Sequence, residues 1–354
     1  MTDTHARLRR LVRLHDARPD LSIRTLFHAG PPYRGTPPKA VTNAAAQAAV
    51  VSGLAETAEQ ARRMIERSEL DLLPAQDHGI AVPLGMVLSA QMWCFEVGDD
   101  TRVFHSPVGE GPPPALRFGS DDPACATRAR DWCAEAAGAI NPLLANGLAV
   151  EPLMSAALQQ GDECHAITAA GNRLFIEQLG PLPAEIKAAI SGNAGFVLGV
   201  WMAWAGWKLQ TSQAMIAAIG GNGREFGWRP RDQAAWRTMP APPPTGKYFQ
   251  PDRAAHALGA VGDSAIVDIC GFGGQALHCA PALMQEWADV LPSDLKQRRD
   301  RIVDSHSGIV DIARIRDSRI EPIINLAILD RDGAAAPLGR GVVIVPPTLF
   351  STGD

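Results

Sequence analysis

The sequence of 354 residues is 46% hydrophobic and 20% charged, with a net charge of −5 at pH 7. The length is typical of two or three domains, and the composition is typical of a packed globular protein. Because there is no basic excess, we expect neither nucleic acid nor an anionic membrane surface as a partner. The 6 cysteines form no CxxC pair. The polar N-terminus lacks the apolar segment of a secretion signal, so we expect reduced thiols in a cytoplasmic protein.

The first third of the chain combines short strands with helices. Residues 1–20 are charged and mixed, which indicates a short helix or a loose tail. Strands are predicted at 21–27, 92–97 and 101–105, where apolar runs are bounded by turn-forming residues. The Ala-rich and then Glu/Arg-rich composition of residues 40–70 predicts helix.

The middle of the chain is helical in composition. Residues 123–182 are rich in alanine and leucine, and prolines at 181 and 183 end the pattern. An uncharged run at 188–207 is long enough to span a membrane, but its serine, asparagine and glycine residues favour a buried helix at 193–208. We therefore expect no membrane-spanning segment.

The last third mixes strands and one helix again. The patterns predict strands at 226–236, 266–270, 323–329 and 341–345, the last two as a hairpin, and a helix at 281–290. Strands and helices follow one another without regular alternation, which favours an α+β fold over a doubly wound sheet.

We expect a multi-domain arrangement of two mixed α/β parts with a small helical segment between them. The predicted boundaries are an N-terminal α/β domain at 1–120, a helical segment at 121–190 and a C-terminal α/β domain with glycine-rich turns and the terminal hairpin at 191–354.

One short stretch of the helical segment, 161–172, is dense in reactive side chains. It contains two acids, a thiol and an imidazole in consecutive positions. If 154–176 is one helix, His165 and Asn172 continue its apolar face, Asp162 lies at the edge of that face and Glu163 points away. A buried polar group needs a partner. The imidazole and amide are therefore either satisfied inside a core or exposed to a pocket.

Two glycine-rich segments are candidate anion sites. Residues 220–227 and 262–274 each place several glycines where backbone N–H groups can approach a phosphate or carboxylate. Neither matches a nucleotide-binding motif, and both have an alternative interpretation as turns that need glycine for packing. Asp263 and Asp268 bracket the strand predicted at 266–270 and are not an obvious carboxylate pair.

Metal binding and covalent catalysis have weaker support. Asp162 and His165 could share a divalent ion with His78 or His278, but there is no HExxH motif, and we predict no metal and no organic cofactor. Cys164 adjoins His165 in sequence, yet neighbouring residues on a helix do not face each other. Ser264 lacks the GxSxG context of a serine nucleophile.

Taken together, these segments resemble one known family. HAGPPY, DHGIAVPLGMVLS, GDECHAITAAGN, GGNGREFG, PAPPPTGKYF, GDSAIVDICGFGG and the terminal hairpin occur in the order seen in the YlbE-like (AllG-type) family. The resemblance covers residues 20–351 and implies an α+β fold with a small helical insertion. It also implies chemistry on a carbamoyl or amide carbon, as in the conversion of oxalurate and phosphate to oxamate and carbamoyl phosphate by an assembly of different subunits. Family members commonly follow the histidine of GDE-x-H with Arg-Asn, where this chain has Ala166 and Ile167.

The motif positions and the glycine turns define the candidate site. The expected catalytic residues are Asp162, Glu163, His165 and Glu225. The expected substrate- or anion-binding residues are His78, Asn172, Gly221, Asn222, Gly223, Asp263, Ser264, Gly271, Gly273 and Gly274. In this hypothesis His165, oriented by Asp162 or Asn172, transfers a proton to the leaving nitrogen, and the glycine amides hold the developing oxyanion and phosphate.

Three hypotheses for the function stay open on the sequence. The first is an enzyme or catalytic subunit that transfers a carbamoyl group of a small ureido or amide acid to phosphate as co-substrate. The second is a non-catalytic scaffolding subunit, whose glycine clusters contact partner chains in a mixed or homo-oligomeric assembly. The third is an amidohydrolase that uses water in place of phosphate.

Overall fold

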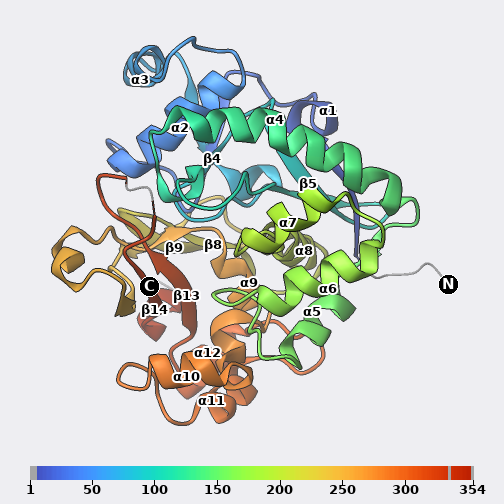
Figure 1. Ribbon diagram of the computed structural model, residues 1–354. Helices are drawn as coiled ribbons and strands as arrows, with labels where there is room; N and C mark the ends of the chain where they lie inside the picture. The colour runs from blue at the N-terminus through green and yellow to red at the C-terminus, as the bar shows by residue number, and fades with distance from the viewer. Residues whose placement is uncertain (1–5, 334–335, 352–354) are drawn as a thin grey trace.

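The computed structural model describes residues 6–333 and 336–351. Figure 1 shows α2, α3 and α4 at one end of the molecule and α10, α11 and α12 at the other. Among the strand pairs of the described residues, β2 with β3 is parallel and the others are antiparallel. Several small sheets with helices around them make a mixed α+β fold, as the sequence predicts.

The first sheet has the order β6-β5-β1-β7 and contains a strand that the sequence analysis missed. Its members are β1 (Arg7–Arg13), β5 (Trp93–Gly98), β6 (Val103–Pro107) and β7 (Leu148–Ala149). The expectation of a helix or loose tail at the N-terminus is wrong for residues 7–13. Leu8 and Leu11 are buried there, while arginines beside them remain accessible and conceal the strand in the composition.

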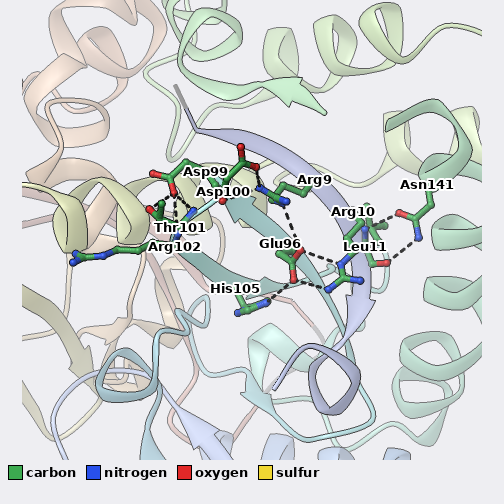
Figure 2. Close-up of polar contacts among 10 residues, drawn as sticks. All are labelled: Arg9, Arg10, Leu11, Glu96, Asp99, Asp100, Thr101, Arg102, His105 and Asn141. Atoms are coloured by element: carbon green, nitrogen blue, oxygen red, sulfur yellow. Dashed lines mark hydrogen bonds and ion pairs between the residues drawn. The ribbon is translucent and has the colours of Figure 1, made fainter. Parts of the chain in front are cut away.

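A buried carboxylate ties this sheet together (Figure 2). Glu96 on β5 is 6% exposed, and its Oε1 accepts a hydrogen bond from Nε of Arg10 at 2.9 Å. Its Oε2 lies 3.3 Å from Nε2 of His105 on the neighbouring strand. A buried charge is stable only with such partners, so this group joins three strands, β1, β5 and β6.

A second small sheet, of order β3-β2-β4, contains the parallel pair. It consists of β2 (Thr25–His28), β3 (Asp71–Pro74) and β4 (Val87–Leu88). Helices α2 (Lys39–Val51) and α3 (Ala58–Glu66) connect β2 to β3, since a parallel pair requires a crossover connection.

Two further sheets come from the last third of the chain. One has the order β10-β9-β8-β12 and consists of β8 (Ile216–Asn222), β9 (Glu225–Pro230), β10 (Arg237–Pro240) and β12 (Val261–Gly262). The other has the order β11-β14-β13 and consists of β11 (Thr245–Tyr248), β13 (Ile323–Ile328) and β14 (Gly339–Ile344). The antiparallel pairing of β13 with β14 confirms the predicted terminal hairpin.

The helices outside the sheets fall into two groups. The first group follows the chain from the N-terminal part into the middle and comprises α1 (Leu14–Ala17), α4 (Pro123–Ile140), α5 (Val150–Leu158), α6 (Ala169–Leu179), α7 (Ala184–Gly192) and α8 (Leu198–Thr211). The second group comprises α9 (Ala265–Ile269), α10 (Pro281–Glu286), α11 (Leu295–Ile302) and α12 (Ile312–Ser318).

Helix α8 is the buried helix that the uncharged run predicts. Trp201, Met202 and Trp204 are all 0% exposed, and the helix packs on β5, β6 and β8. The packing is close because a Cβ atom at Gly206 would overlap the ring of Phe104. Among the described residues, no helix is long and apolar enough to cross a membrane.

Two local predictions in the last third are wrong. Residues 265–269 form helix α9 instead of a strand, because a short apolar run does not by itself distinguish the two conformations. Gly220, Gly221 and Asn222 belong to strand β8, and the turn begins only at Gly223, where φ is +84°. These glycines lie where neighbouring backbones approach too closely for a side chain.

One large hydrophobic core contains residues from all three predicted parts, among them Leu26, Cys133 and Ile266. A second, smaller cluster includes Leu283, Trp287 and Val342. The domain boundaries at 120 and 190 stay predictions, and hydrophobic contacts cross both of them.

Candidate active site

The residues between α5 and α6 form a loop, not the continuation of a helix. The backbone at Gly161 and Cys164 has φ values of +90° and +70°, in the left-handed region that interrupts a helix. The predicted helical face that holds His165 and Asn172 is therefore wrong. Asp162 does not orient His165; its Oδ2 accepts the N–H of Gly171 at 2.7 Å, near the start of α6. A carboxylate there satisfies an amide that the first helical turn leaves unpaired.

Glu163 is fully buried, which corrects the expectation that it points away from the protein. Its carboxylate accepts the N–H of Ala166, the N–H of Ile167 at 3.0 Å and Nδ2 of Asn325 at 2.9 Å. Burial raises the pKa of Glu163, and the charge of His165 together with the backbone amides opposes that rise. The side chain thus fixes the shape of the loop and joins it to β13.

His165 and Asp268 form a buried pair. Nδ1 of His165 lies 2.8 Å from Oδ2 of Asp268, and the side chains are 5% and 0% exposed. Burial lowers the pKa of His165, but the charge of Asp268 and its hydrogen bond outweigh burial, and the resulting pKa is raised. The carboxylate also fixes the tautomer, since an ionised Asp can only accept and Nδ1 must carry the proton. Nε2 has no hydrogen-bond partner among the described residues and is left for other chemistry.

Two of the predicted glycines make room for Asp268. Its Oδ1 accepts the N–H of Gly274 at 2.5 Å and the N–H of Asn325 at 3.1 Å. A Cβ atom at Gly273 would overlap the Asp268 carboxylate, and one at Gly274 would overlap the carbonyl of Ile323. Glycine is required here for close approach of the carboxylate.

The N–H groups of the 271–274 turn donate inside the protein. Gly271 donates to the carbonyl of Asp268 at 3.1 Å and Gly273 to the carbonyl of Glu163 at 2.6 Å. With Gly274 bound to the Asp268 side chain, the geometry of this turn does not support an anion cradle. Its role is to position the carboxylate that holds His165.

His165 lines a cavity of about 780 Å³. The walls come from the loop at 165–169, α6, α7, the first turn of α8, the hairpin β13–β14 and residues 83–86. Of the predicted site residues, the cavity brings together His165 and Asn172. Asn172 supports the wall: its Oδ1 accepts the N–H of Val197 at 3.1 Å and its Nδ2 donates to the carbonyl of Asn193 at 3.0 Å.

Four cationic side chains line the same cavity: Arg117, Arg173, Lys187 and Arg340. Two of them are paired with carboxylates, Arg340 with Glu286 at 2.7 Å and Arg173 with Glu177 at 2.9 Å. Within residues 6–333 and 336–351, no ion pair is recorded for the other two. They are the cations available to an anionic ligand.

Arg117 is held in a fixed position at the wall. One guanidinium nitrogen donates to the carbonyl of Gly111 at 2.8 Å and another lies 3.3 Å from Oδ1 of Asn193. Burial lowers its pKa, and the nearby buried carboxylate of Glu110 opposes that change. A half-buried guanidinium held by neutral acceptors keeps donors for a carboxylate or phosphate.

A second group of predicted residues meets away from the cavity lining. Asp263 accepts the N–H of Gly30 at 2.8 Å, the N–H of Val82 at 3.0 Å and Nε2 of Gln76 at 2.6 Å. Burial raises its pKa to about 7, against the effect of these donors. The side chain joins segments far apart in the sequence, which is a structural role.

Asn222 and the glycines around it belong to the same group. Nδ2 of Asn222 donates to the carbonyl of Pro31 at 2.8 Å, and Oδ1 accepts the N–H of Glu225 at 2.8 Å. Gly221 pairs with Phe226 in the strand ladder. The N–H of Gly223 donates to the carbonyl of Ala260 at 3.0 Å.

Three further predicted residues are also absent from the cavity lining. Oε1 of Glu225 accepts a hydrogen bond from Oγ1 of Thr238 at 2.8 Å. The ring of His78 lies 5.2 Å from that of Phe27. Ser264 is fully buried, and its Oγ has no partner in the described part of the chain. The structure therefore separates these residues from His165, and their binding or catalytic roles stay predictions.

A metal-compatible group occurs elsewhere, at His256, Asp330 and Asp332. One ligand atom from each residue lies within 4.8 Å of the others. The Asp330 carboxylate is already paired with Arg253 and accepts the N–H of Asp332 at 2.9 Å. Since Arg253 neutralises the only buried member, this group is accounted for without an ion.

Sequence reasoning missed Asp268, Arg117 and Asn325. The signal for Asp268 is present: it is a lone carboxylate within a run of apolar residues, five positions before Gly273. A buried charge needs a partner, but nothing local in the sequence identifies His165 as that partner. No comparable signal singles out Arg117 or Asn325.

Comparisons with known proteins agree with this architecture. Over 98% of this chain and 92% of the other, the structure matches a crystal structure of a conserved protein of unknown function from Enterococcus faecalis V583, with a TM-score of 0.86 at 23% identity. This likeness shows a shared fold.

Sequence relatives cover nearly the whole chain. The uncharacterized protein YahG of Escherichia coli K12 is 26% identical over 94% of this chain and 78% of its own length. The oxamate carbamoyltransferase subunit AllG of the same organism is 26% identical over 92% of this chain and 87% of its own. The family described as oxamate carbamoyltransferase subunit AllG matches residues 70–264, more than half of the sequence, and the chain belongs to this AllG family.

Proposed function

We propose that this protein is a subunit of a carbamoyltransferase and that it contributes an acid–base residue to the transfer of the carbamoyl group of a small ureido or amide acid. The observation that carries the proposal is the His165–Asp268 pair at 2.8 Å, with His165 in the wall of a cavity that also contains Arg117 and Lys187, which form no ion pair with any described residue. Asp268 is the positioning residue and His165 the catalytic residue.

The chemistry of carbamoyl transfer matches the state of His165. An oxygen of phosphate attacks the carbamoyl carbon, the bond from that carbon to the leaving nitrogen breaks, and the nitrogen must receive a proton. A raised pKa favours the protonated imidazole more than in a free histidine. His165 then donates the Nε2 proton to the leaving nitrogen, and Asp268 stabilises the imidazolium beforehand.

The cavity also suits an acidic substrate. Arg117 offers a fixed, half-buried guanidinium and Lys187 an exposed ammonium, so one can bind the carboxylate of the ureido acid and the other the phosphate. With Ala166 and Ile167 after His165, the wall is apolar on that side. Arg117 is then the principal determinant of substrate binding.

The proposal includes partner subunits and a cytoplasmic location. The related E. coli protein is named as a subunit, and the remaining parts of the reaction centre would come from other chains. All 6 cysteines are free, which suits a reducing compartment.

The test is to assay the purified chain alone and after co-expression with the products of neighbouring genes. Oxalurate is supplied with or without phosphate, and oxamate and carbamoyl phosphate are separated by chromatography. We expect phosphate-dependent product only from the assembly. Product without phosphate identifies an amidohydrolase instead. Unchanged turnover in an assembly that carries His165→Gln assigns the chain a scaffolding role and rejects the catalytic one.

A further inference from the structure

A second, smaller hollow lies between the β5–β6 hairpin, the end of α8 and strands β8 and β9. Its volume is about 310 Å³, and we call it the arginine hollow, defined by Arg102, Arg229, Arg231, Gln76, Gln210 and Ala217. No carboxylate is among these lining residues. The hollow is distinct from the His165 cavity, because the two lie at opposite ends of α8. Leu198 lines the cavity and Gln210 the hollow, about 18 Å apart at 1.5 Å per helical residue.

Backbone carbonyls hold two of the arginines in place. Arg102 donates to the carbonyl of Gln210 at 3.0 Å, and Figure 2 shows its side chain directed away from Glu96 and His105. Arg231 donates from Nε to the carbonyl of Ala214 at 2.7 Å. Guanidinium groups fixed by neutral acceptors lose little further freedom when they bind a ligand.

The hairpin that carries Arg102 is itself fixed to α8. Oδ1 of Asp99 accepts the N–H of Arg102 at 2.8 Å, and its Oδ2 accepts Nε1 of Trp207 at 3.2 Å. Arg102 is therefore held at the mouth of the hollow by the fold.

The positive charge exceeds what the end of α8 requires. Arginines often cap the last carbonyls of a helix, and a helix C-terminus carries only about −0.5 charge. Arg229 adds a third positive charge. Its ion pair with Asp77 at 2.9 Å neutralises one of the three. A positive excess of about 1.5 charges remains, or about 0.5 when the carboxylate of Asp99 on the hairpin is also counted. Burial, followed by the charges of Arg102 and Arg229, lowers the pKa of Arg231, as mutual repulsion requires.

Of the two glutamines in the wall, one has an amide donor available to a ligand. The side chain of Gln76 is fully engaged with Ile219 and Asp263, at 2.8 Å and 2.6 Å from its Nε2. Gln210 has no side-chain hydrogen bond recorded in the described part of the chain, so its amide is available. A wall of fixed guanidinium groups plus an amide donor matches an oxyanion of high charge, most closely a phosphoryl group.

We propose that the arginine hollow is a binding site for free phosphate or for the phosphoryl group of a small phosphate ester, separate from the His165 cavity. The site is independent of carbamoyl transfer. Binding there would relieve repulsion among three arginines at one end of α8, whose other end forms part of the cavity wall.

Equilibrium dialysis of the full-length protein with radiolabelled inorganic phosphate, at constant ionic strength set with chloride, tests this proposal. We expect Arg102→Gln to weaken one class of site at least about tenfold, the effect of losing one charge-assisted hydrogen bond. Arg102→Lys should retain part of the affinity. Arg229→Gln, at the other side of the hollow, should weaken the same class if Arg102→Gln does not fold.

Two control variants separate this site from other effects. Arg24→Gln removes an exposed arginine that likewise donates to a backbone carbonyl, that of Glu69 at 2.6 Å, and should leave binding unchanged. Arg117→Gln alters the His165 cavity. It should leave unchanged the phosphate binding that Arg102→Gln weakens. Competition by glycerol 3-phosphate would indicate that the hollow accepts a phosphate ester, and its absence that it accepts free phosphate alone. Equal phosphate binding by wild type, Arg102→Gln and Arg229→Gln overturns the proposal.

Discussion

Nδ1 of His165 lies 2.8 Å from Oδ2 of Asp268, although the two residues are 103 positions apart in the chain. Both side chains are almost completely buried. An ion pair in such surroundings fixes the orientation and the tautomer of the imidazole and presents its Nε2 atom to the cavity. The predictions that concern the active site depend on this contact.

Replacement of Asp268 by asparagine should reduce turnover while substrate affinity stays nearly constant. The substitution removes the charge that raises the pKa of His165, so the limb of the pH–rate profile that reports His165 should move to lower pH. We expect kcat to fall by roughly 100-fold or more, the usual contribution of general acid–base catalysis. The measurement is kcat and KM of the assembled enzyme between pH 5 and 9.

The matched control for that variant is Asp162→Asn. Asp162 caps α6 from the same loop, and in the described structure its carboxylate forms no hydrogen bond with the imidazole. Its loss should lower stability and leave the shape of the pH profile unchanged. Equal shifts of the profile in both variants would refute a specific role for Asp268.

Substitution of Gly274 by alanine should damage both stability and activity. The added Cβ would overlap the carbonyl of Ile323 and displace the amide that donates to Asp268. Overpacking of this kind costs about 1–3 kcal/mol of unfolding free energy, measurable by denaturant titration. In contrast, a Cβ atom at Gly138 on α4 would have no other atom within 4 Å. Gly138→Ala should therefore raise the free energy of unfolding by up to about 1 kcal/mol. Wild-type stability in Gly274→Ala would contradict the packing described above.

The Glu96 network should make stability depend on acid pH (Figure 2). Burial by itself raises the pKa of Glu96. Hydrogen bonds with His105 and Arg10 together outweigh burial, and the pKa falls from 4.5 to about 2. A carboxyl group whose pKa is lower in the folded protein stabilises the fold when the pH is above the pKa of the unfolded chain, here 4.5. That contribution is lost as the pH falls from 4.5 toward 2. The free energy of unfolding should fall by about 3 kcal/mol over this pH range.

Unfolding by urea at a series of pH values from 6 to 2 measures this dependence. Glu96→Gln should flatten the acid limb of the stability curve relative to wild type. Glu59→Gln removes an exposed carboxylate paired with Arg63 on α3 and should leave the limb nearly unchanged. If Glu96→Gln loses as much stability as wild type between pH 6 and pH 2, the pH dependence comes from other carboxylates.

Removal of the fixed cation in the cavity should weaken substrate binding. Arg117→Gln deletes donors at the wall that Gly111 and Asn193 hold in position. We expect KM for the acid substrate to rise about tenfold with a smaller change in kcat. Arg173→Gln is the control, since Arg173 lies in the same wall but is exposed and paired with Glu177. A larger effect of Arg173→Gln than of Arg117→Gln would exclude Arg117 as the carboxylate ligand.

Much of the fold follows from local sequence patterns. The terminal hairpin is predictable because two apolar runs flank a turn of aspartate and glycine, and α8 because its uncharged run has no polar face. Strand β1 escapes prediction because arginine makes up more than half of its 7 residues. Helix α9 escapes because five apolar-rich residues carry no period that separates helix from strand.

The candidate site is only partly accessible from sequence. His165 stands out as part of a stretch dense in reactive side chains, and it lines the cavity. Its partner Asp268 could not be deduced, since no local rule brings together residues 103 positions apart. Asp263 and Asn222 looked equally distinctive, yet the structure gives them hydrogen bonds that join distant segments. A buried polar residue in a sequence thus indicates a required partner without showing whether that partner serves catalysis or folding.

The most direct measurement of the central claim is the rate of carbamoyl phosphate formation by the assembled protein with His165→Gln, compared with wild type at saturating substrate and phosphate. Glutamine fills the space of the imidazole and cannot donate a proton from a group with a pKa near neutrality. The account predicts a loss of at least about 100-fold with unchanged assembly. A rate equal to that of wild type would contradict it.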